Sequence, residues 1–281
     1  MTSLRIRLTA SGLLAIPKRV HLADPGSPAD FMKNILSPTQ LKALARIDSP
    51  TVANVIELFD CRSYLSGFTN HELKAVYPEL APAVGYAVTA TFRASAPEQD
   101  EGDAYGGLPQ LLEDSSQTPE PRFVVFQDLD GIPKAATYGE VMVSSFKAFG
   151  FAGLITSGAA RDIEQVRQLK FPCWATSTIV SHGYCRFIRS QVPVNVAGME
   201  IRPGDLIHAD ANGMIQIPHS IAPAVADLCE PFIQAEQIIL DYLRKDNPTV
   251  TGYRAAFKEC KAAFAALRTR AQAYLKSHTE S

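Results

Sequence analysis

Hydrophobic and polar positions along this chain follow two different spacings, and the changes between them mark its segments. Near the N-terminus apolar residues recur at steps of three and four, which is typical of one face of a helix. This spacing predicts a helix that begins near Ser37 and Pro38 and a second helix that begins near Ser49. Their expected buried faces are Leu41, Leu44 and Ile47 in the first helix, and Val52, Val55, Ile56 and Phe59 in the second.

The middle of the chain alternates short apolar runs with helical spacing. The runs predict strands over residues 85–92, 123–126, 153–156 and 173–176, and the helical spacing predicts helices over 139–149 and 162–170. Strand, helix, strand, helix, strand in this order indicates parallel pairing with right-handed crossovers, and therefore an α/β fold.

An acidic segment, residues 97–121, lies between the first two of these strands. It holds seven acidic residues, no basic residue, and several glycines and prolines. Such a segment is typical of a solvated excursion from the fold, and the apolar residues within it predict one short helix around 108–112.

After residue 180 the spacing becomes that of short strands. Strands are predicted over 192–196, 199–201, 206–210 and 214–217, and Asn212 followed by Gly213 indicates a tight hairpin between the last two. Residues 222–277 return to helical spacing, with a narrow apolar seam formed by Tyr253, Phe257, Cys260, Phe264, Leu267, Ala271 and Tyr274. The seam fits two arrangements equally well, a helix packed on its own core and a helix packed against a neighbouring subunit.

Composition narrows the class of protein further. The 281 residues are 46% hydrophobic and 20% charged, as in soluble globular domains, which excludes a disordered or collagen-like chain. A formal net charge of −2 provides no basic field for nucleic acid or an anionic membrane. No apolar run reaches the roughly 20 residues of a membrane span. We therefore expect neither nucleic acid nor a membrane as a partner.

The cysteines and the N-terminus bear on the cellular compartment. The five cysteines are odd in number and widely spaced, unlike a disulfide framework. The apolar stretch after Arg5 and Arg7 is short, is broken by Ser11 and Gly12, and lacks a cleavage site, so it does not predict secretion. The sequence favours a reducing, cytoplasmic location.

Common catalytic signatures are absent from the sequence, among them the phosphate loop, the dinucleotide-binding glycine motif, the serine elbow and the HExxH and CxxC motifs. Cys173, His182 and Cys185 lie near one another in sequence, but their spacing matches no zinc pattern, and buried cysteine is the better interpretation. His208 and Asp210 share one face of a predicted strand. Asp210 opens the Asp-Ala-Asn-Gly turn, where a carboxylate caps its own backbone, so a turn role is favoured over a ligand role.

Arg161 and Asp162 are the remaining candidates, because they follow a predicted strand and precede a predicted helix. Ligands in α/β sheets gather beyond the carboxyl ends of the strands. Asp162 has two interpretations: an N-cap with Gln165 as its capping-box partner, or a functional acid. The residues alone favour the cap.

A series of short motifs, each weak alone and specific in this order, resembles the RraA-like family. The motifs are Gly139-Glu140, Gly150, Gly153, Ser157-Gly158, Arg161-Asp162, Phe171-Pro172, Arg202-Pro203-Gly204-Asp205-Leu206, Ala209-Asp210, Asn212-Gly213 and Ile217-Pro218. That family includes 4-hydroxy-4-methyl-2-oxoglutarate aldolases and a ribonuclease regulator. The resemblance runs from about Ser49 to Leu243 and is strongest over 123–218.

The resemblance implies a swivelling β/β/α domain. The RraA-like α/β core would occupy residues 41–220, with an N-terminal arm over 1–40 and a C-terminal helical extension over 221–281. It also implies a homotrimer or a hexamer built as a dimer of trimers, with the sites between subunits.

The resemblance further implies a metal-dependent site. Arg161 would hold the carboxylate and carbonyl of a pyruvate unit, and Asp162 would bind a divalent metal, Mg²⁺ or Mn²⁺. Backbone N–H groups of the helix that starts after Gly139, at Glu140, Val141 and Met142, would hold the same carboxylate, as helix N-termini bind anions. Glu236 stands where the family places an acid that orients metal-bound water in a neighbouring subunit's site. A solvent-facing helical Glu236 is the other interpretation.

The function that the resemblance implies is a class II aldolase, a carbon–carbon lyase that cleaves a small 4-hydroxy-2-oxo acid to pyruvate. The same site would decarboxylate oxaloacetate, since both reactions pass through a pyruvate enolate stabilised by the metal and Arg161. Metal-bound water or hydroxide is the candidate base. The alternative is a non-catalytic regulatory binding protein that acts through protein–protein contacts.

The sequence departs from the family pattern at three positions. Ser157, Gln165 and Asn54 stand where many members carry acids. These departures concern the surroundings of the site and its substrate rather than the metal. Asp162 is retained, whereas the ribonuclease regulators lack that acid, and this favours an enzyme. Methyl transfer to a quinone, a label attached to some members, is disfavoured because no glycine-rich nucleotide loop follows the first strand.

Overall fold

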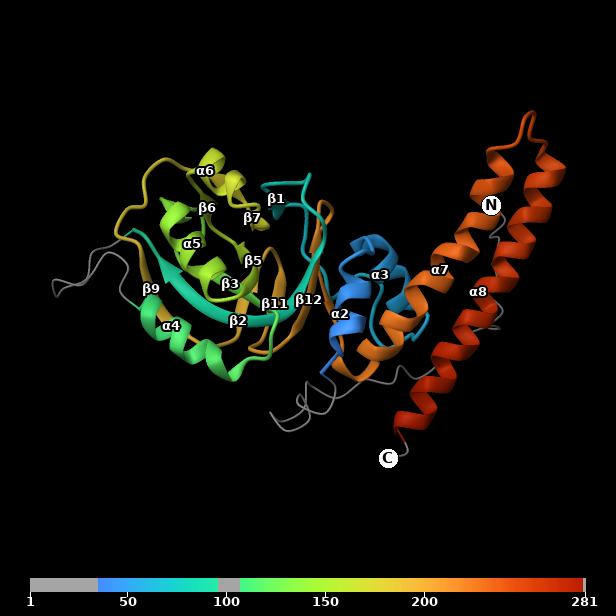
Figure 1. Ribbon diagram of the computed structural model, residues 1–281, viewed down its shortest axis with the longest axis horizontal. Coiled ribbons are helices and arrows are strands. Elements are labelled where there is room, and N and C mark those ends of the chain that lie inside the picture. Colours follow the sequence, from blue (N-terminus) through green and yellow to red (C-terminus); the bar gives the residue numbers. More distant parts are fainter. Residues whose placement is uncertain (1–34, 96–106, 280–281) are drawn as a thin grey trace, which may run out of the picture.

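One strongly curved, barrel-like sheet organises the chain, of which the computed structural model describes residues 35–95 and 107–279 (Figure 1). The path of the sheet is β1 (Lys74–Ala75), β7 (Cys173–Ala175), β5 (Phe151–Thr156), β3 (Arg122–Asp128), β2 (Ala83–Arg93), β12 (Leu206–Asp210) and β13 (Gly213–Ile217). A further strand, β9 (Arg186–Ser190), pairs with β2. The strands β2, β3, β5 and β7 are parallel, as predicted, and the other pairings are antiparallel.

A second, small sheet is built from the residues that follow the long parallel strands. It consists of β4 (Ala136–Tyr138), β6 (Ala159–Ala160) and β8 (Ser177–Thr178), all parallel. Helix α5 (Glu140–Ala148) follows β4, and helix α6 (Ile163–Gln168) follows β6. The first two units are therefore long strand, short strand, helix, and the third, β7 and β8, has no helix after it. Hydrophobic spacing does not predict the short strands, because two or three residues are too few to show a period.

The predicted β meander is present. A small hairpin of β10 (Val194–Val196) and β11 (Met199–Ile201) precedes the β12–β13 hairpin. Asp210 Oδ1 accepts a hydrogen bond from the Asn212 N–H at 2.7 Å, which confirms its turn role. Asp210 Oδ2 also accepts from the Ser49 N–H at 2.8 Å, and His208 Nδ1 lies 2.9 Å from Ser49 Oγ. These two side chains therefore fasten the first turn of a helix to the sheet.

Four helices lie together beside one end of the sheet (Figure 1). They are α2 (Pro38–Leu44), α3 (Ser49–Glu57), α7 (Ala222–Leu243) and α8 (Val250–Thr279). Ser37 and Gln40 form a capping box that starts α2, and the Asp48 side chain accepts from the Thr51 N–H to start α3. One hydrophobic cluster contains residues from all four helices together with Tyr86, Leu206 and Ile217 of the sheet. This core crosses the predicted boundary at residue 220.

The apolar seam of α8 packs on its own chain along most of its length. Cys260, Leu267 and Ala271 are buried, and Phe264 stacks on Phe232 of α7 with 4.6 Å between ring centroids. Tyr253 and Phe257, nearer the turn between α7 and α8, are 39% and 51% exposed. The first of the two predicted arrangements thus holds for the larger part of the seam.

The acidic segment is described only in its second part. The predicted short helix is present as α4 (Leu108–Asp114), followed by a 3₁₀ turn at Ser115–Gln117. The structure does not describe residues 96–106 of this segment. It also does not describe residues 1–34 of the predicted arm, which include the apolar stretch after Arg5 and Arg7.

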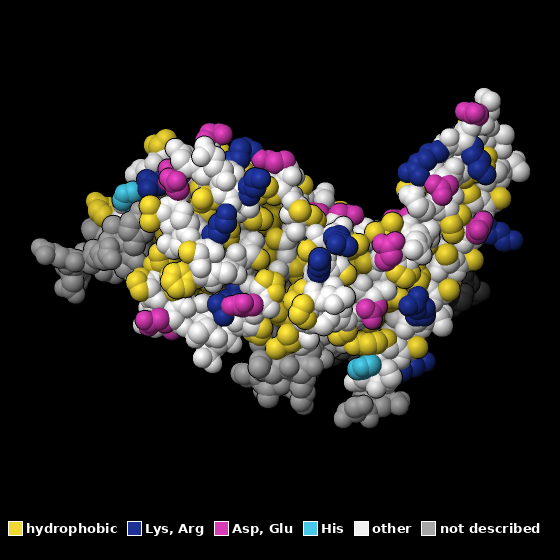
Figure 2. Space-filling model, in the orientation of Figure 1, with side chains coloured by type: hydrophobic (Ala, Val, Ile, Leu, Met, Phe, Trp, Pro, Cys, Tyr) yellow, Lys and Arg dark blue, Asp and Glu magenta, His cyan; other side chains and the backbone are white. Residues whose placement is uncertain are grey.

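None of the helices in the described ranges is long and apolar enough to cross a membrane. Basic and acidic side chains are interspersed over the face in Figure 2.

Candidate functional site

The register of the small sheet brings two helix starts together. Ala136 pairs with Ala159, and Tyr138 pairs with Ala160. The residues that follow these strands, Gly139 and Arg161, therefore leave the same edge of the sheet. This edge is where ligands bind in parallel α/β arrangements.

Asp162 caps a helix, but not the one that it precedes. Its backbone is left-handed, with φ 54° and ψ 42°, and its side chain makes no capping bond to α6. The predicted capping box with Gln165 is therefore wrong, because a capping residue needs an extended backbone to reach its own helix. Asp162 Oδ2 instead accepts a hydrogen bond from the Glu140 N–H at 2.9 Å. The carboxylate thus sits at the N-terminus of α5, where the helix dipole favours negative charge.

Gly139 makes this approach possible. Its backbone is extended, with φ −150° and ψ −168°, so no unusual conformation requires a glycine. A Cβ at this position would meet Asp162 Oδ2 and would lie 2.8 Å from Arg161 Nε. The side chains of Arg161 and Asp162 occupy the space that a side chain at position 139 would need.

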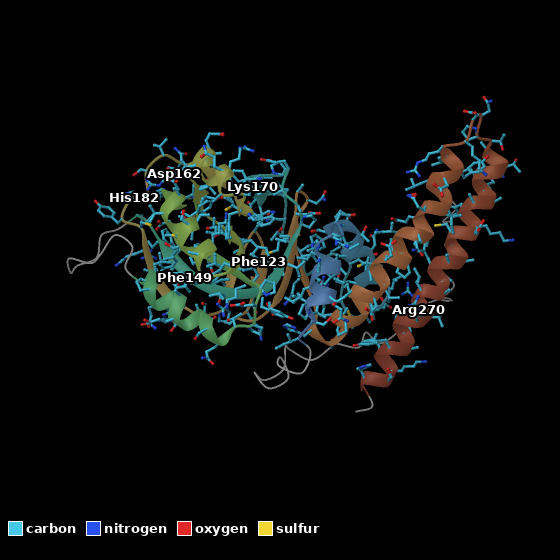
Figure 3. The ribbon with its side chains drawn as sticks, in the orientation of Figure 1. Phe123, Phe149, Asp162, Lys170, His182 and Arg270 are labelled. Atoms are coloured by element: carbon cyan, nitrogen blue, oxygen red, sulfur yellow. The ribbon has the colours of Figure 1, made fainter. Side chains whose placement is uncertain are left out.

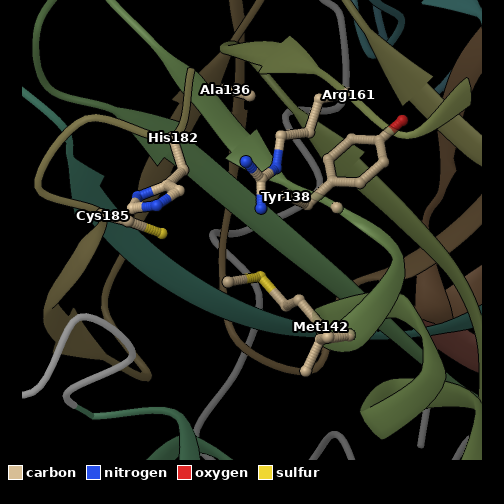
Figure 4. Close-up of a pocket in the computed structure, with 8 residues that line it drawn as sticks. Ala136, Tyr138, Met142, Arg161, His182 and Cys185 are labelled. Atoms are coloured by element: carbon tan, nitrogen blue, oxygen red, sulfur yellow. The ribbon is translucent and has the colours of Figure 1, made fainter. Parts of the chain in front are cut away.

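A small pocket opens beside this contact (Figure 4). The guanidinium of Arg161 points into it, while Arg161 Nε lies 3.6 Å from Asp162 Oδ2. Val141 and Met142 also line the pocket. Their N–H groups lie in the first turn of α5, so they have no acceptor within the helix. The complete lining is Ala136, Tyr138, Gly139, Val141, Met142, Arg161, His182 and Cys185. A cation and a helix N-terminus together make a site for a small carboxylate.

The predicted site residues divide into those that the pocket contains and those that lie beside it. Gly139, Val141, Met142 and Arg161 line the pocket. Glu140 is exposed and its N–H is already bonded to Asp162, so it offers no free donor there. The Asp162 side chain is 34% exposed at the edge of the pocket.

A metal at this site would have one protein carboxylate, that of Asp162. The described residues contain no group of three His, Cys, Asp or Glu that could hold a metal ion. Mg²⁺ commonly keeps several waters and binds through one or two carboxylates together with its substrate, and Mn²⁺ also prefers oxygen. The donor set therefore fits a hydrated Mg²⁺ or Mn²⁺ ion and does not fit a closed zinc site.

Cys173, His182 and Cys185 form no metal cluster. Cys173 is fully buried, and burial raises the pKa of its thiol far above the usual range. Burial raises the pKa of Cys185 to about 11, although the charge of Arg161 opposes the shift. Both thiols are therefore neutral near pH 7, as expected of buried cysteines.

His182 is the lining residue that sequence reasoning considered only as a zinc ligand. Its Nδ1 is buried and has no hydrogen-bond partner among the described residues. Figure 4 shows its ring beside Cys185, with the Arg161 guanidinium next to it and Met142 below both in this view. The available signal was its place shortly after β8, the third strand of the small sheet.

Glu236 does not approach the pocket within one chain. It is half-buried on α7, and Figure 1 shows α7 on the other side of the molecule from α6, the helix that Asp162 precedes (Asp162 is labelled in Figure 3). Burial, and then the charge of Asp48, raise the pKa of its carboxyl, and it also lies close enough to Cys260 of α8 to influence that thiol. A role for Glu236 in catalysis would require a second subunit.

The positions that depart from the family pattern lie outside the pocket lining. Ser157 Oγ accepts a hydrogen bond from the Asp128 N–H at 2.9 Å, so it joins the ends of β3 and β5. Gln165 and Asn54 are exposed on α6 and α3.

Comparison with known proteins identifies the architecture. The family model described as RraA-like, Aldolase/RraA, matches residues 52–216. A structure of an uncharacterized protein from Pseudomonas syringae pv. tomato superposes with a TM-score of 0.62 at 20% identity, covering 78% of this chain and 94% of that one. Streptomyces coelicolor RraAS2, described as an unusual member of the RNase ES inhibitor RraA protein family, superposes with a TM-score of 0.54 at 29% identity, covering 72% and 96%. The expected fold class is confirmed.

A curated relative carries the name of a proposed 4-hydroxy-4-methyl-2-oxoglutarate aldolase. This protein, from Halalkalibacterium halodurans, is 35% identical over 99 residues, which cover 35% of this chain and 47% of the relative. The chain thus spans about half the length of this relative.

Proposed function

Because the chain belongs to the RraA-like family, we propose that it is a divalent-metal-dependent lyase that cleaves a 4-hydroxy-2-oxo acid to pyruvate. The observation that carries the proposal is the pocket in which Arg161 and the N-terminus of α5 converge beside Asp162. The name of the relative from Halalkalibacterium halodurans supports the same reaction class. Decarboxylation of oxaloacetate is the expected second activity.

The pocket binds the pyruvate half of the substrate. The substrate carboxylate accepts from the N–H groups of Val141 and Met142, since the Glu140 N–H is engaged by Asp162. The guanidinium of Arg161 contacts the carboxylate and the 2-oxo group. This contact holds the reacting end in one orientation and places fixed positive charge beside the oxygen that becomes negative.

Asp162 would hold the Mg²⁺ or Mn²⁺ ion. When bound, the ion supplies Lewis-acid stabilisation of negative charge on the enolate oxygen. Arg161 supports the same charge from the protein side. The carboxylate of Asp162 is kept in place by the Glu140 N–H and by the space at Gly139.

The lysines near the site support an enolate route rather than a Schiff base. Neither Lys134 nor Lys147 lines the pocket. Lys147 Nζ donates a hydrogen bond to the Leu169 carbonyl at 2.6 Å, and Lys134 is exposed. A Schiff-base lysine needs a desolvated amine beside the carbonyl carbon, and these two lysines do not meet that need.

Assembly into a homotrimer or a hexamer would bring Glu236 of one subunit to the Asp162 of another. The exposed apolar residues Tyr253 and Phe257, near the turn between α7 and α8, support a contact between subunits there. If sites are shared, mixing Asp162→Asn subunits with Glu236→Gln subunits restores activity that each variant alone lacks. Mixtures that stay as inactive as the separate variants would contradict a shared site.

A cytoplasmic location accompanies the proposal. The five cysteines are all free thiols, four of them buried. This state fits a reducing compartment.

A non-catalytic regulatory protein is the second candidate. The similarity to RraAS2, whose description places it in an inhibitor family, favours it. Such a protein would act through its surface and would have no use for the charge on Asp162.

Pyruvate release separates the two candidates. It is measured with 4-hydroxy-4-methyl-2-oxoglutarate and with oxaloacetate, in Mg²⁺ or Mn²⁺, with and without EDTA. We expect turnover that EDTA abolishes and that falls at least about 100-fold in Asp162→Asn and Asp162→Ala. Absence of turnover on both substrates, or turnover unchanged in these variants, would refute the proposed function and leave the regulatory candidate.

A further inference from the structure

His182 has an unmet polar group in the pocket. Its side chain lines the site together with Arg161, and its Nδ1 is buried without a hydrogen-bond partner among the described residues. A buried ring nitrogen without a partner is costly, and such groups are rare unless a ligand or a function accounts for them. A group of a bound substrate would provide the missing partner.

The segment that carries His182 is held firmly by its backbone. The Ile179 N–H donates to the Ala160 carbonyl at 3.0 Å, and the Ala136 N–H donates to the Ser181 carbonyl at 2.7 Å. On the other side, the Tyr184 N–H donates to the Ala94 carbonyl at 3.0 Å. These bonds fix the backbone that carries His182 relative to β4 and β6, the two strands that also position Gly139 and Arg161.

Gly183 adds to this constraint. Its φ is +55°, and a Cβ there would lie 2.5 Å from the Ala94 carbonyl oxygen. Both the conformation and the close approach require glycine directly after His182. The histidine is therefore placed by the fold rather than exposed at random on a loop.

The other polar groups of the pocket are poor proton acceptors near neutral pH. Burial raises the pKa of the Cys185 thiol to about 11 and raises the pKa of the Tyr138 hydroxyl well above its usual value. The guanidinium of Arg161 has no acceptor. The carboxylate of Asp162 is engaged by the Glu140 N–H and lies beside Arg161. Among the lining side chains, this leaves the imidazole of His182.

We propose that His182 is the proton-transfer residue of the lyase reaction, an inference that rests on the proposed function. The imidazole takes the proton of the substrate 4-hydroxyl as the C3–C4 bond breaks. Oxygen 4 becomes the carbonyl of the first product, and the electron pair of the broken bond forms the enolate of pyruvate. The imidazolium then returns the proton to C3 of the enolate, which gives pyruvate and restores the neutral histidine. No oxidant or further reactant is needed.

The two reactions of the site depend differently on such a residue. Cleavage of the 4-hydroxy acid needs a base before the bond can break. Oxaloacetate loses CO₂ from a carboxylate that is already ionised, and water can protonate the resulting enolate. A proton-transfer role for His182 therefore predicts that the two activities separate when it is replaced.

The experiment compares both activities in one preparation of His182→Asn. Pyruvate formation is measured from 4-hydroxy-4-methyl-2-oxoglutarate and from oxaloacetate, and binding of oxalate, which resembles the enolate, is measured by calorimetry. We expect kcat for the aldol cleavage to fall about 100-fold or more, the usual contribution of general acid–base catalysis. Decarboxylation and oxalate affinity stay within the same order of magnitude. Tyr184→Phe, on the same segment and exposed, is the matched control and keeps both activities.

Each other outcome overturns the inference. Equal loss of both activities and of oxalate binding would show that His182 only supports the structure of the pocket. Unchanged aldol cleavage would show that another group carries the proton. A wild-type protein without either activity would instead refute the proposed function, and with it this role of His182.

Discussion

Replacing Gly139 with alanine tests the contact between the two helix starts. The new methyl group would collide with Asp162 Oδ2 and would lie 2.8 Å from Arg161 Nε. The carboxylate must then leave the Glu140 N–H, to which it is bonded at 2.9 Å. Because the extended backbone at Gly139 suits any residue, the effect comes from this displacement and not from backbone strain.

The expected cost follows from three contributions. A hydrogen bond to a charged group contributes about 1.5–3 kcal/mol, and the low end applies because the Asp162 side chain is one-third exposed. Steric strain at a filled position adds about 1–3 kcal/mol. Alanine also lowers the conformational entropy of the unfolded chain, which stabilises the folded protein by about 0.4–1 kcal/mol and offsets part of this cost. The free energy of unfolding should therefore fall by about 2 kcal/mol.

Urea unfolding of four proteins measures this coupling: wild type, Gly139→Ala, Asp162→Ala and the double variant. If alanine at 139 acts by displacing the carboxylate, it should cost much less when Asp162 is already absent, and the two costs should not add. Turnover should fall about 100-fold in Gly139→Ala, as expected for a displacement near 1 Å in a site. Additive stability costs, or a Gly139→Ala protein with full stability and turnover, would refute the reasoning.

The remaining predictions concern other parts of the molecule. Burial lowers the pKa of His208, so the unfolded state binds a proton there more readily than the folded state. The contribution of the neutral His208 to the free energy of unfolding is therefore present above about pH 6.5 and is lost as the pH falls below that value. His208→Asn should flatten this pH dependence in unfolding experiments between pH 7.5 and 5.5. Part of the dependence should remain because burial also lowers the pKa of His219. The control His71→Gln, at an exposed histidine, should not change it. Leu267→Ala should lower the free energy of unfolding in urea by about 2–4 kcal/mol, because Leu267 is buried in the helical core. Phe257→Ala should lower it by less than about 0.5 kcal/mol, because Phe257 is half-exposed. Equal costs would show that α8 does not depend on this seam.

Features with a local physical cause were predictable from the sequence. The helix start at Ser37 and Pro38 and the Asn212–Gly213 hairpin each depend on residues close in the chain, and both are present. The parallel order of the long strands followed from their alternation with helices. The short strands of the small sheet were not predictable, because their formation depends on neighbours that only the folded chain provides.

The site shows the same division between local and distant causes. The capping signal at Asp162 and Gln165 is a local pattern, and the register of β4 against β6 overrides it by presenting the Glu140 N–H to the carboxylate. The place of Arg161 and Asp162 after a predicted strand made them candidates, and the resemblance to a family supplied their roles and the start of α5. His182 was not singled out for catalysis, since a lone histidine in a loop carries no spacing signal.

The packing of α8 also constrains how the chain folds during its synthesis. Gln272 Nε2 donates to the Leu58 carbonyl across 214 positions of sequence, and Leu267 and Ala271 share a cluster with Leu44 and Val55. The helices α2 and α3 are synthesised early, yet α7 packs on them only after the whole sheet has emerged, and α8 completes the cluster later still. The parallel strands between them need no such partner and can pair first. We therefore expect the nascent chain to expose the helical core longest, and chaperones that bind apolar segments to act on residues 38–59.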